Sequence, residues 1–264
     1  MAPDAPPLHV DVDGDGDGPV VALAHGFGGS ARNFGPQARA LRDRWRVVRW
    51  DARGHARSGA PGAPAAYTPD LAVDDLRRVL DHVGAGVAVV GGLSMGAATA
   101  LGFALAHPAR VRGLVLASYP DAAAGGLSRV ALPFADAIER DGLEAAGAAF
   151  AWGPTSGLDA RGATLVRQGF IEHPPHGLVH TLRGVLARTP SLDALAPRLP
   201  AVRQPTLLIA GERDAVALGA SRRLAALLPD AQLVVVREAG HVVNLERPAP
   251  FNAALREFLD AVAG

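Results

Sequence analysis

The sequence contains no cysteine, and all of its strongly basic side chains are arginine because lysine is absent as well. Without cysteine the chain has no disulfide and no thiol nucleophile. Without lysine it has no catalytic amine that could form a Schiff base. These absences exclude two routes of covalent catalysis, and the lack of cysteine is typical of a reducing compartment.

An excess of charge of one sign is also missing, because 26 basic residues balance 26 acidic residues. Such a chain creates no global field that attracts nucleic acid or an anionic membrane. Its first ten residues, MAPDAPPLHV, lack the basic start and the apolar stretch of a signal peptide. We therefore expect a cytoplasmic protein that acts on a small molecule, with no nucleic-acid or membrane partner, and no feature indicates its oligomeric state.

One uncharged run, residues 87–106, has the length of a membrane span. Its sequence, VAVVGGLSMGAATALGFALA, is interrupted by glycine and serine, and β-branched residues fill only its first part. This pattern favours a buried strand, a turn and a buried helix.

Short apolar segments alternate with helical segments along the chain. The expected strands are residues 8–12, 20–24, 46–50, 87–90, 113–117, 206–210 and 232–236. The expected helices lie near residues 30–42, 70–82, 95–106, 217–228 and 249–262. Strands this apolar are buried on both faces, so the pattern predicts an α/β fold with a mainly parallel, doubly wound sheet.

The alternation stops between about residues 121 and 196, which are rich in alanine, glycine and isolated proline. This stretch has helical periodicity and no convincing strand. We interpret it as a helical cap insertion, residues 121–196, in a core made of residues 1–120 and 197–264.

The loop after the second expected strand, in VVALAHGFGGSA (20–31), is ambiguous. Gly26, Gly28 and Ala31 match a G-x-G-x-x-A dinucleotide fingerprint, and Asp51 follows at a distance suited to a ribose hydroxyl. Read alone, the loop predicts a nucleotide site.

A second motif, GLSMG at residues 92–96, predicts a nucleophile elbow. Gly92, Ser94 and Gly96 form G-x-S-x-G between an expected strand and an expected helix, which is the context this motif requires. The turn is so sharp that small residues must flank the serine, whose own backbone is strained.

A serine hydroxyl needs a base to take its proton and an acid to orient that base. In this architecture the order along the chain is serine, acid, histidine. Asp214 and His241 follow the ends of two later strands and, with Ser94, give that order. Glu212 in the same loop and Asp121 after an earlier strand remain alternatives for the acid.

Five segments together resemble the α/β-hydrolase superfamily over essentially the whole chain. They are HGFGGS (25–30), DARGHARSG (51–59), GLSMG (92–96), GERDAV (211–216) and GHVVNLERP (240–248). The sequence is most similar to small single-cap serine hydrolases, such as 3-oxoadipate enol-lactonases and cofactor-free esterases. Ala56 and Ala97 stand where many relatives have glycine, and Ala56 weakens the assignment to any one subfamily.

The resemblance implies a different role for the glycine loop. It implies that the backbone N–H groups of Phe27 and Met95 bind the substrate oxyanion, with Gly26 and Gly28 shaping the loop. It also implies that no cofactor and no metal is needed. We therefore favour the hydrolase interpretation of this loop over the nucleotide one.

Metal sites are the weaker interpretation of two other patterns. His176 and His180 have the spacing of zinc ligands on a helix, near His173, but no acid or cysteine completes a site. The DVDGDGDG segment resembles a calcium loop, yet Ala24 stands where a glutamate is needed, so we expect a solvated hairpin turn.

Two features of the insertion bear on its substrate. Four aromatic residues either line an apolar pocket or pack the cap: Phe134, Phe150, Trp152 and Phe170. A carboxylated substrate would need an arginine partner, for which the unranked candidates are Arg129, Arg140, Arg161, Arg167, Arg183 and Arg188.

The sequence thus predicts a serine hydrolase that cleaves a small ester or lactone through Ser94, His241 and Asp214 and an acyl-enzyme. Carbon–carbon bond hydrolysis and perhydrolysis use similar residues and remain alternatives. A ligand-binding protein or receptor that keeps the fold with little turnover is the alternative from another class.

Overall fold

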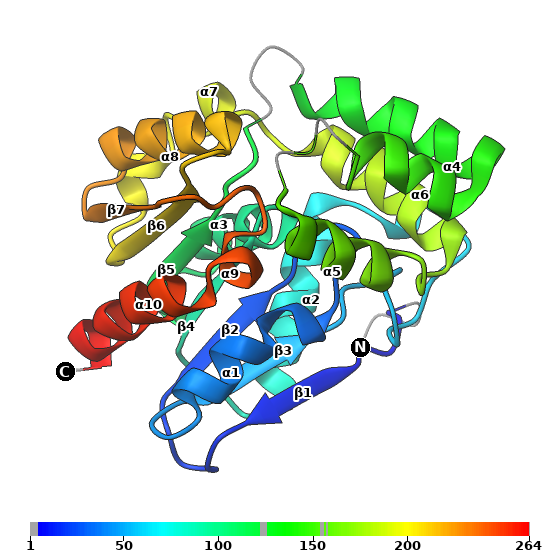
Figure 1. The fold of residues 1–264 in the computed structure, drawn as a ribbon. Coiled ribbons are helices and arrows are strands. Elements are labelled where there is room, and N and C mark those ends of the chain that lie inside the picture. The colour runs from blue at the N-terminus through cyan, green and yellow to red at the C-terminus, as the bar shows by residue number, and fades with distance from the viewer. Residues whose placement is uncertain (1–4, 122–125, 154–155, 157, 264) are drawn as a thin grey trace.

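The computed structural model describes residues 5–121, 126–153, 156 and 158–263. Its centre is a seven-stranded sheet in the order β1-β3-β2-β4-β5-β6-β7 (Figure 1). The strands are β1 (Val10–Asp13), β2 (Val20–Ala24), β3 (Arg46–Trp50), β4 (Ala88–Leu93), β5 (Val111–Ala117), β6 (Thr206–Gly211) and β7 (Ala231–Val236).

Strands β2 to β7 run parallel, and only the edge strand β1 pairs antiparallel, with β3. Every residue of β2, β4 and β6 is buried, as their continuous apolar sequence predicts. The predicted hairpin between the first two strands is wrong. Because β3 lies between β1 and β2 in the sheet, the DGDGDG turn joins two strands that do not pair.

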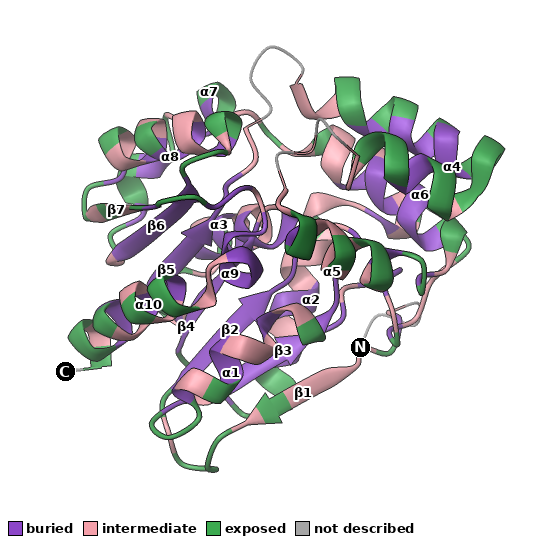
Figure 2. Cartoon of the chain, in the orientation of Figure 1, coloured by how far each residue is buried: buried purple, intermediate pink, exposed green. Residues whose placement is uncertain are grey.

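Helices cover both faces of the sheet and enclose two hydrophobic clusters. Residues of α2, α3 and α8 pack in one cluster, and residues of α1 and α10 in the other. In Figure 2 the central strands are almost entirely buried, whereas the edge strands β1 and β7 and the outer sides of the helices carry intermediate and exposed residues. The bounds are α1 (Gly35–Leu41), α2 (Pro69–His82), α3 (Met95–Ala106), α8 (Ala215–Leu227), α9 (Val243–Glu246) and α10 (Pro248–Ala263).

The elements that the structure describes between β5 and β6 are all helices. They lie beside the loops that follow β2 and β3 (Figure 1). Its helices are α4 (Gly126–Phe150), α5 (Ala160–Phe170), α6 (Pro175–Gly184) and α7 (Leu192–Leu195). A kink at Gly142, where φ is +79°, divides α4. A third hydrophobic cluster holds α4, α5 and α6 together.

Among the described residues there are also five short 3-10 helices: Ala31–Phe34, Pro64–Ala66, Pro108–Arg110, Leu186–Arg188 and Leu199–Ala201. The prediction of a doubly wound, mainly parallel α/β sheet is confirmed. The apolar run 87–106 is indeed a strand, a turn and a helix, and none of the helices that the structure describes is long and apolar enough to cross a membrane.

Candidate active site

Ser94 occupies the tight turn between β4 and α3. Its backbone angles, φ 54° and ψ −114°, lie in a region that non-glycine residues rarely adopt. A Cβ atom at Gly92 would lie 2.5 Å from the Ala24 carbonyl oxygen, and one at Gly96 only 2.1 Å from it. No larger residue therefore fits two positions before or two positions after the serine, which explains both glycines of the motif and the close packing of the strained turn against β2.

Asp214 follows β6 and begins helix α8, where its Oδ1 accepts a hydrogen bond from the Ala217 N–H. Its Oδ2 lies 2.6 Å from Nδ1 of His241, in the loop after β7. Burial alone would raise the pKa of the Asp214 carboxyl, but the hydrogen bond and charge interaction with His241 lower it below its ordinary value. The carboxylate is therefore ionised near neutral pH and fixes the orientation of the imidazole.

The two alternative acids point elsewhere. Glu212 is exposed and its Oε2 accepts the Glu238 N–H at 3.0 Å. Asp121 pairs with Arg223 at 2.9 Å. Of the three candidate acids, Asp214 is the one with a described contact to His241.

Ser94 and His241 line the same cavity, whose volume is about 370 Å³. No hydrogen bond joins the Ser94 hydroxyl to His241 among the contacts described. Catalytic hydrogen bonds are often long or misaligned until a substrate binds. The three predicted residues thus follow the carboxyl ends of β4, β6 and β7, and the carboxylate of Asp214 is already hydrogen-bonded to His241.

The glycine loop after β2 lies directly beside the serine. A Cβ atom at Gly26 would lie 3.5 Å from Cβ of Ser94, which is van der Waals contact, so the loop packs against the serine turn. Phe27 comes next, and Met95 is the first residue of α3. Neither of their N–H groups donates to a protein acceptor in the described contacts, which leaves both available at the Ser94 end of the cavity.

Asp51, the acid that the nucleotide interpretation assigned to a ribose, supports this loop instead. It is fully buried, its Oδ1 accepts the Ala31 N–H at 2.7 Å, and its Oδ2 pairs with Arg57 at 2.8 Å. An acid whose oxygens are occupied in this way has no role in holding a nucleotide.

Three histidines hold the glycine loop, and the sequence did not indicate this role for two of them, His55 and His173. The Gly28 N–H donates to Nε2 of His55 at 3.2 Å, and the Gly28 carbonyl accepts from Nε2 of His173 at 2.8 Å. Nε2 of His25 accepts the Ala52 N–H at 2.9 Å. Gly28 itself has φ +67°, and its Cα faces the Phe170 ring so closely that no side chain fits.

These histidines are neutral because they are buried away from water. Burial lowers the pKa of His25 to about 4 and lowers the pKa values of His55 and His173 as well. Each ring has one nitrogen that donates to a carbonyl and one that accepts an amide N–H, so each is in a single tautomer. The loop next to Ser94 is thus fixed by neutral imidazoles from both the core and the helical segment.

The predicted metal alternative finds no support. Nε2 of His176 contacts the Ala60 carbonyl and Nε2 of His180 contacts the Gly62 carbonyl, both at 3.1 Å. The described residues contain no group of three or more metal-ligating side chains. Both histidines therefore bind the helical segment to the loop after β3.

The cavity above Ser94 is lined mainly by apolar side chains of the helical segment. Phe134 and Phe150 form part of its wall, and their rings stack 4.9 Å apart. Phe170 also stacks on Phe134, with the ring centroids 5.6 Å apart. The aromatic residues of the insertion thus both pack against one another and line a pocket.

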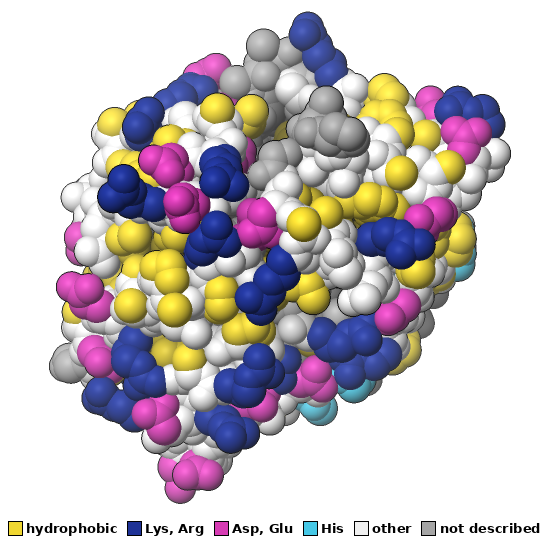
Figure 3. Space-filling view, in the orientation of Figure 1, with side chains coloured by type: hydrophobic (Ala, Val, Ile, Leu, Met, Phe, Trp, Pro, Cys, Tyr) yellow, Lys and Arg dark blue, Asp and Glu magenta, His cyan; other side chains and the backbone are white. Residues whose placement is uncertain are grey.

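The six candidate arginines lie outside this cavity lining. Arg140, Arg167 and Arg183 form ion pairs on the surface with Asp141, Glu144 and Glu139, respectively. The remaining three are exposed: Arg129, Arg161 and Arg188. Figure 3 shows charges of both signs interspersed over one face, consistent with a chain of zero net charge.

A parallel α/β sheet with a strained serine at a strand end, beside a paired aspartate and histidine, defines a hydrolase-type fold. A family model described as "Alpha/beta hydrolase family" matches residues 21–254, and the chain belongs to that family. The resemblance drawn from the five sequence segments is therefore confirmed.

Individual relatives are similar over nearly their whole length. A putative 2-succinyl-6-hydroxy-2,4-cyclohexadiene-1-carboxylate synthase of Bacillus subtilis is 31% identical, with 92% of this chain and 91% of that protein covered. A putative carbamate hydrolase RutD of Variovorax paradoxus is 34% identical, with 97% of both covered. The enol-lactonase structure of Burkholderia xenovorans has a TM-score of 0.85 at 26% identity, covering 98% of this chain and 99% of that one.

Proposed function

We propose that this protein is a serine hydrolase that cleaves a small carboxylic ester or lactone. The observation that carries the proposal is the strained Ser94, which shares one cavity with a His241 whose Nδ1 is bound to Asp214. A hydroxyl, a base and an orienting carboxylate in this relation are the parts that nucleophilic acyl transfer needs.

In the proposed reaction, Ser94 Oγ attacks the substrate carbonyl and His241 Nε2 takes its proton. Asp214 accepts the Nδ1–H, which keeps Nε2 free as the base and stabilises the imidazolium that forms. His241 then protonates the leaving alcohol, and the acyl group remains on Ser94. A water molecule activated by the same imidazole releases the acid.

The oxyanion of each tetrahedral intermediate is stabilised by the backbone N–H groups of Phe27 and Met95. Support comes from the approach of Gly26 to Ser94 and from the position of Met95 at the start of α3, where the helix dipole favours negative charge. Loss of a single donor in comparable sites slows the reaction by about 10² to 10³. We further propose that residues 121–196 form a cap over the sheet at the Ser94 end, since the described helices of this segment supply much of the cavity lining.

The names of the relatives suggest two further bond types for the same residues. One relative is named a carbamate hydrolase, and a carbamate presents the same carbonyl to Ser94. Another is named a synthase, so carbon–carbon chemistry also stays an alternative. Neither needs a different nucleophile, so the substrate panel decides between them.

The test is a turnover panel of esters, lactones, carbamates and diketones, with Ser94→Ala as the inactive variant. Ser118→Ala is a matched control, because Ser118 directly follows the neighbouring strand β5, is fully buried and also has a positive φ, 44°. We expect ester or lactone turnover that falls by at least about 10³ in Ser94→Ala and persists in Ser118→Ala. Equal turnover in both variants would refute the assignment.

A further inference from the structure

The wall of the cavity above Ser94 contains no aspartate, glutamate, lysine or arginine side chain, as far as the described chain extends. Its polar side chains besides Ser94 and His241 are Asn33 and Ser156, whose side-chain oxygens accept the Ser30 and Leu158 N–H groups. The rest of the lining is aromatic, aliphatic or glycine.

We propose that the cavity selects uncharged, apolar ester or lactone substrates and rejects those that carry a carboxylate. The inference rests on the proposed hydrolysis and adds the substrate class. The two relatives discussed above have names that mention a carboxylate and a carbamate, so sequence similarity alone does not give this preference.

The first argument is that no arginine side chain lines the described part of the cavity, where it could pair with a substrate carboxylate. Of the six arginines of the helical segment that could serve, three are ion-paired at the surface, and Arg129, Arg161 and Arg188 are exposed away from the lining. The residues at 122–125, 154–155 and 157 are alanine, glycine, proline and threonine in the sequence, so they contribute no charge either.

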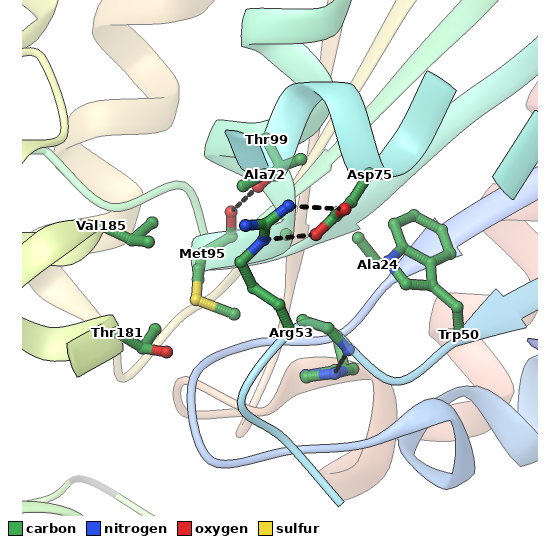
Figure 4. A pocket seen from close by; sticks show the side chains of 12 residues that line it. Ala24, Trp50, Arg53, Ala72, Asp75, Met95, Thr99, Thr181 and Val185 are labelled. Carbon is green, nitrogen blue, oxygen red and sulfur yellow. Dashed lines mark hydrogen bonds and ion pairs between the residues drawn. The ribbon is translucent and has the colours of Figure 1, made fainter. Parts of the chain in front are cut away.

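Arg53 is a buried arginine whose charge is already paired with a carboxylate. It lines a separate cavity of about 30 Å³ together with Met95, as Figure 4 shows. Nε and Nη2 bind the two carboxylate oxygens of Asp75 at 2.6 and 2.8 Å, Nη1 donates to the Ala66 carbonyl, and Nη2 also donates to the Leu71 carbonyl. Four of the five N–H donors of the guanidinium are thus occupied, and its charge is paired with Asp75 outside the cavity above Ser94.

The second argument is electrostatic. With His241 neutral, the Asp214–His241 pair carries one negative charge at the cavity, because the pKa of Asp214 is lowered. A second carboxylate brought into this space would be both desolvated and repelled. A carboxylate that loses its hydration without gaining a cationic partner is destabilised enough to lower kcat/KM by about 100-fold or more.

The test compares three methyl esters of nearly equal shape. Methyl 5-methylhexanoate is neutral and apolar, monomethyl glutarate replaces its isopropyl group by a carboxylate, and the corresponding primary amide is polar but uncharged. We expect kcat/KM to be at least about 100-fold lower for the carboxylate than for the apolar ester, with the amide between them. A carboxylate ester that is cleaved as fast as the apolar one would overturn the proposal.

A variant can restore what the cavity lacks. Val130 lines the cavity from α4 and is 53% exposed, so an arginine there can be accommodated without disturbing the core. We expect Val130→Arg to raise kcat/KM for monomethyl glutarate by up to about fivefold, since ion pairs near solvent are weak. Val130→Gln adds length without charge and should give no such rise. An equal rise in both variants would mean that charge does not set the preference.

The labelling of Ser94 by a fluorophosphonate separates the two levels of the proposal. If Ser94 is labelled but no ester is turned over, protection from labelling by the three esters gives the order of binding, and the same order is expected. A labelled enzyme that prefers the carboxylate ester refutes the selectivity alone. A folded protein that is neither labelled nor active refutes the proposed hydrolysis itself.

Discussion

Acid is expected to weaken this fold through the three buried histidines around Gly28. His25, His55 and His173 are neutral in the folded protein because burial lowers their pKa values. In the unfolded chain each returns to a value near 6.5. Below that value the unfolded state binds more protons than the folded state, so the free energy of unfolding falls as the pH falls.

The pKa shift of His25 gives a minimum for the loss in the free energy of unfolding. Its pKa moves from 6.5 to about 4 on folding. Integrated over pH, this shift removes about 2 kcal/mol of the free energy of unfolding between pH 7 and pH 5, and about 3 kcal/mol once the pH is well below 4. His55 and His173 shift in the same direction and add to the loss. Carboxylates such as Asp51 and Asp214, whose pKa values are lowered, act below this window.

The assay is urea unfolding at pH 7 and pH 5, with the free energy extrapolated to water. In His25→Gln the difference between the two pH values should shrink by about 2 kcal/mol, because the titrating group is gone. His82→Gln is the matched control, since His82 is exposed at the end of α2. A free energy of unfolding that is equal at both pH values in the unaltered protein would refute the reasoning.

Two further predictions concern catalysis. Asp214→Asn should lower kcat by about 10⁴ at constant KM, because the amide cannot hold the imidazole in the reactive tautomer. Glu212→Gln should leave ester turnover unchanged. Steady-state kinetics of the two variants test this, and the reverse pattern would assign the acid to Glu212. His173→Phe removes the donor to the Gly28 carbonyl and is expected to lower kcat at least about tenfold with a small change in KM, because it shifts the Phe27 N–H in the glycine loop and leaves the apolar lining from α4, α5 and α6 in place. Partial recovery is expected in His173→Gln. A rise in KM alone would place His173 in substrate binding instead.

The sheet and the serine turn were predictable because their signals are local. Four apolar residues before GLSMG predict a buried strand, and the glycines around Ser94 are required by contacts with the neighbouring strand. Asp214 and His241 were placed by the order of strands along the chain. A hydrogen bond between them could be expected, although the sequence left Glu212 and Asp121 as alternatives to Asp214 for the acid.

The rest depends on contacts between distant segments. Nothing in the sequence around His173 indicates that it donates to the Gly28 carbonyl, 145 residues away. Its partner is a backbone group, which has no sequence signature, so the same residue also fitted a metal pattern. The pairing of β1 with β3 was missed for a similar reason, since the short DGDGDG turn suggested a hairpin.

The arginines of the helical segment show a limit of another kind. Six of them lie in the sequence segment that we expected to cover the substrate, but the direction in which a side chain points from a helix depends on packing. Arg183, for example, points outward to Asp136 and Glu139. Only the folded structure reveals that the inner side is apolar.

The most direct test of the account is covalent labelling of the folded protein by a fluorophosphonate, followed by peptide mapping. We predict one phosphonylated residue, Ser94, with labelling abolished in Ser94→Ala, slowed in His241→Ala and retained in Ser118→Ala. A folded protein that takes up no label, or that is labelled to the same extent after Ser94→Ala, would contradict the central claim that Ser94 is an activated nucleophile.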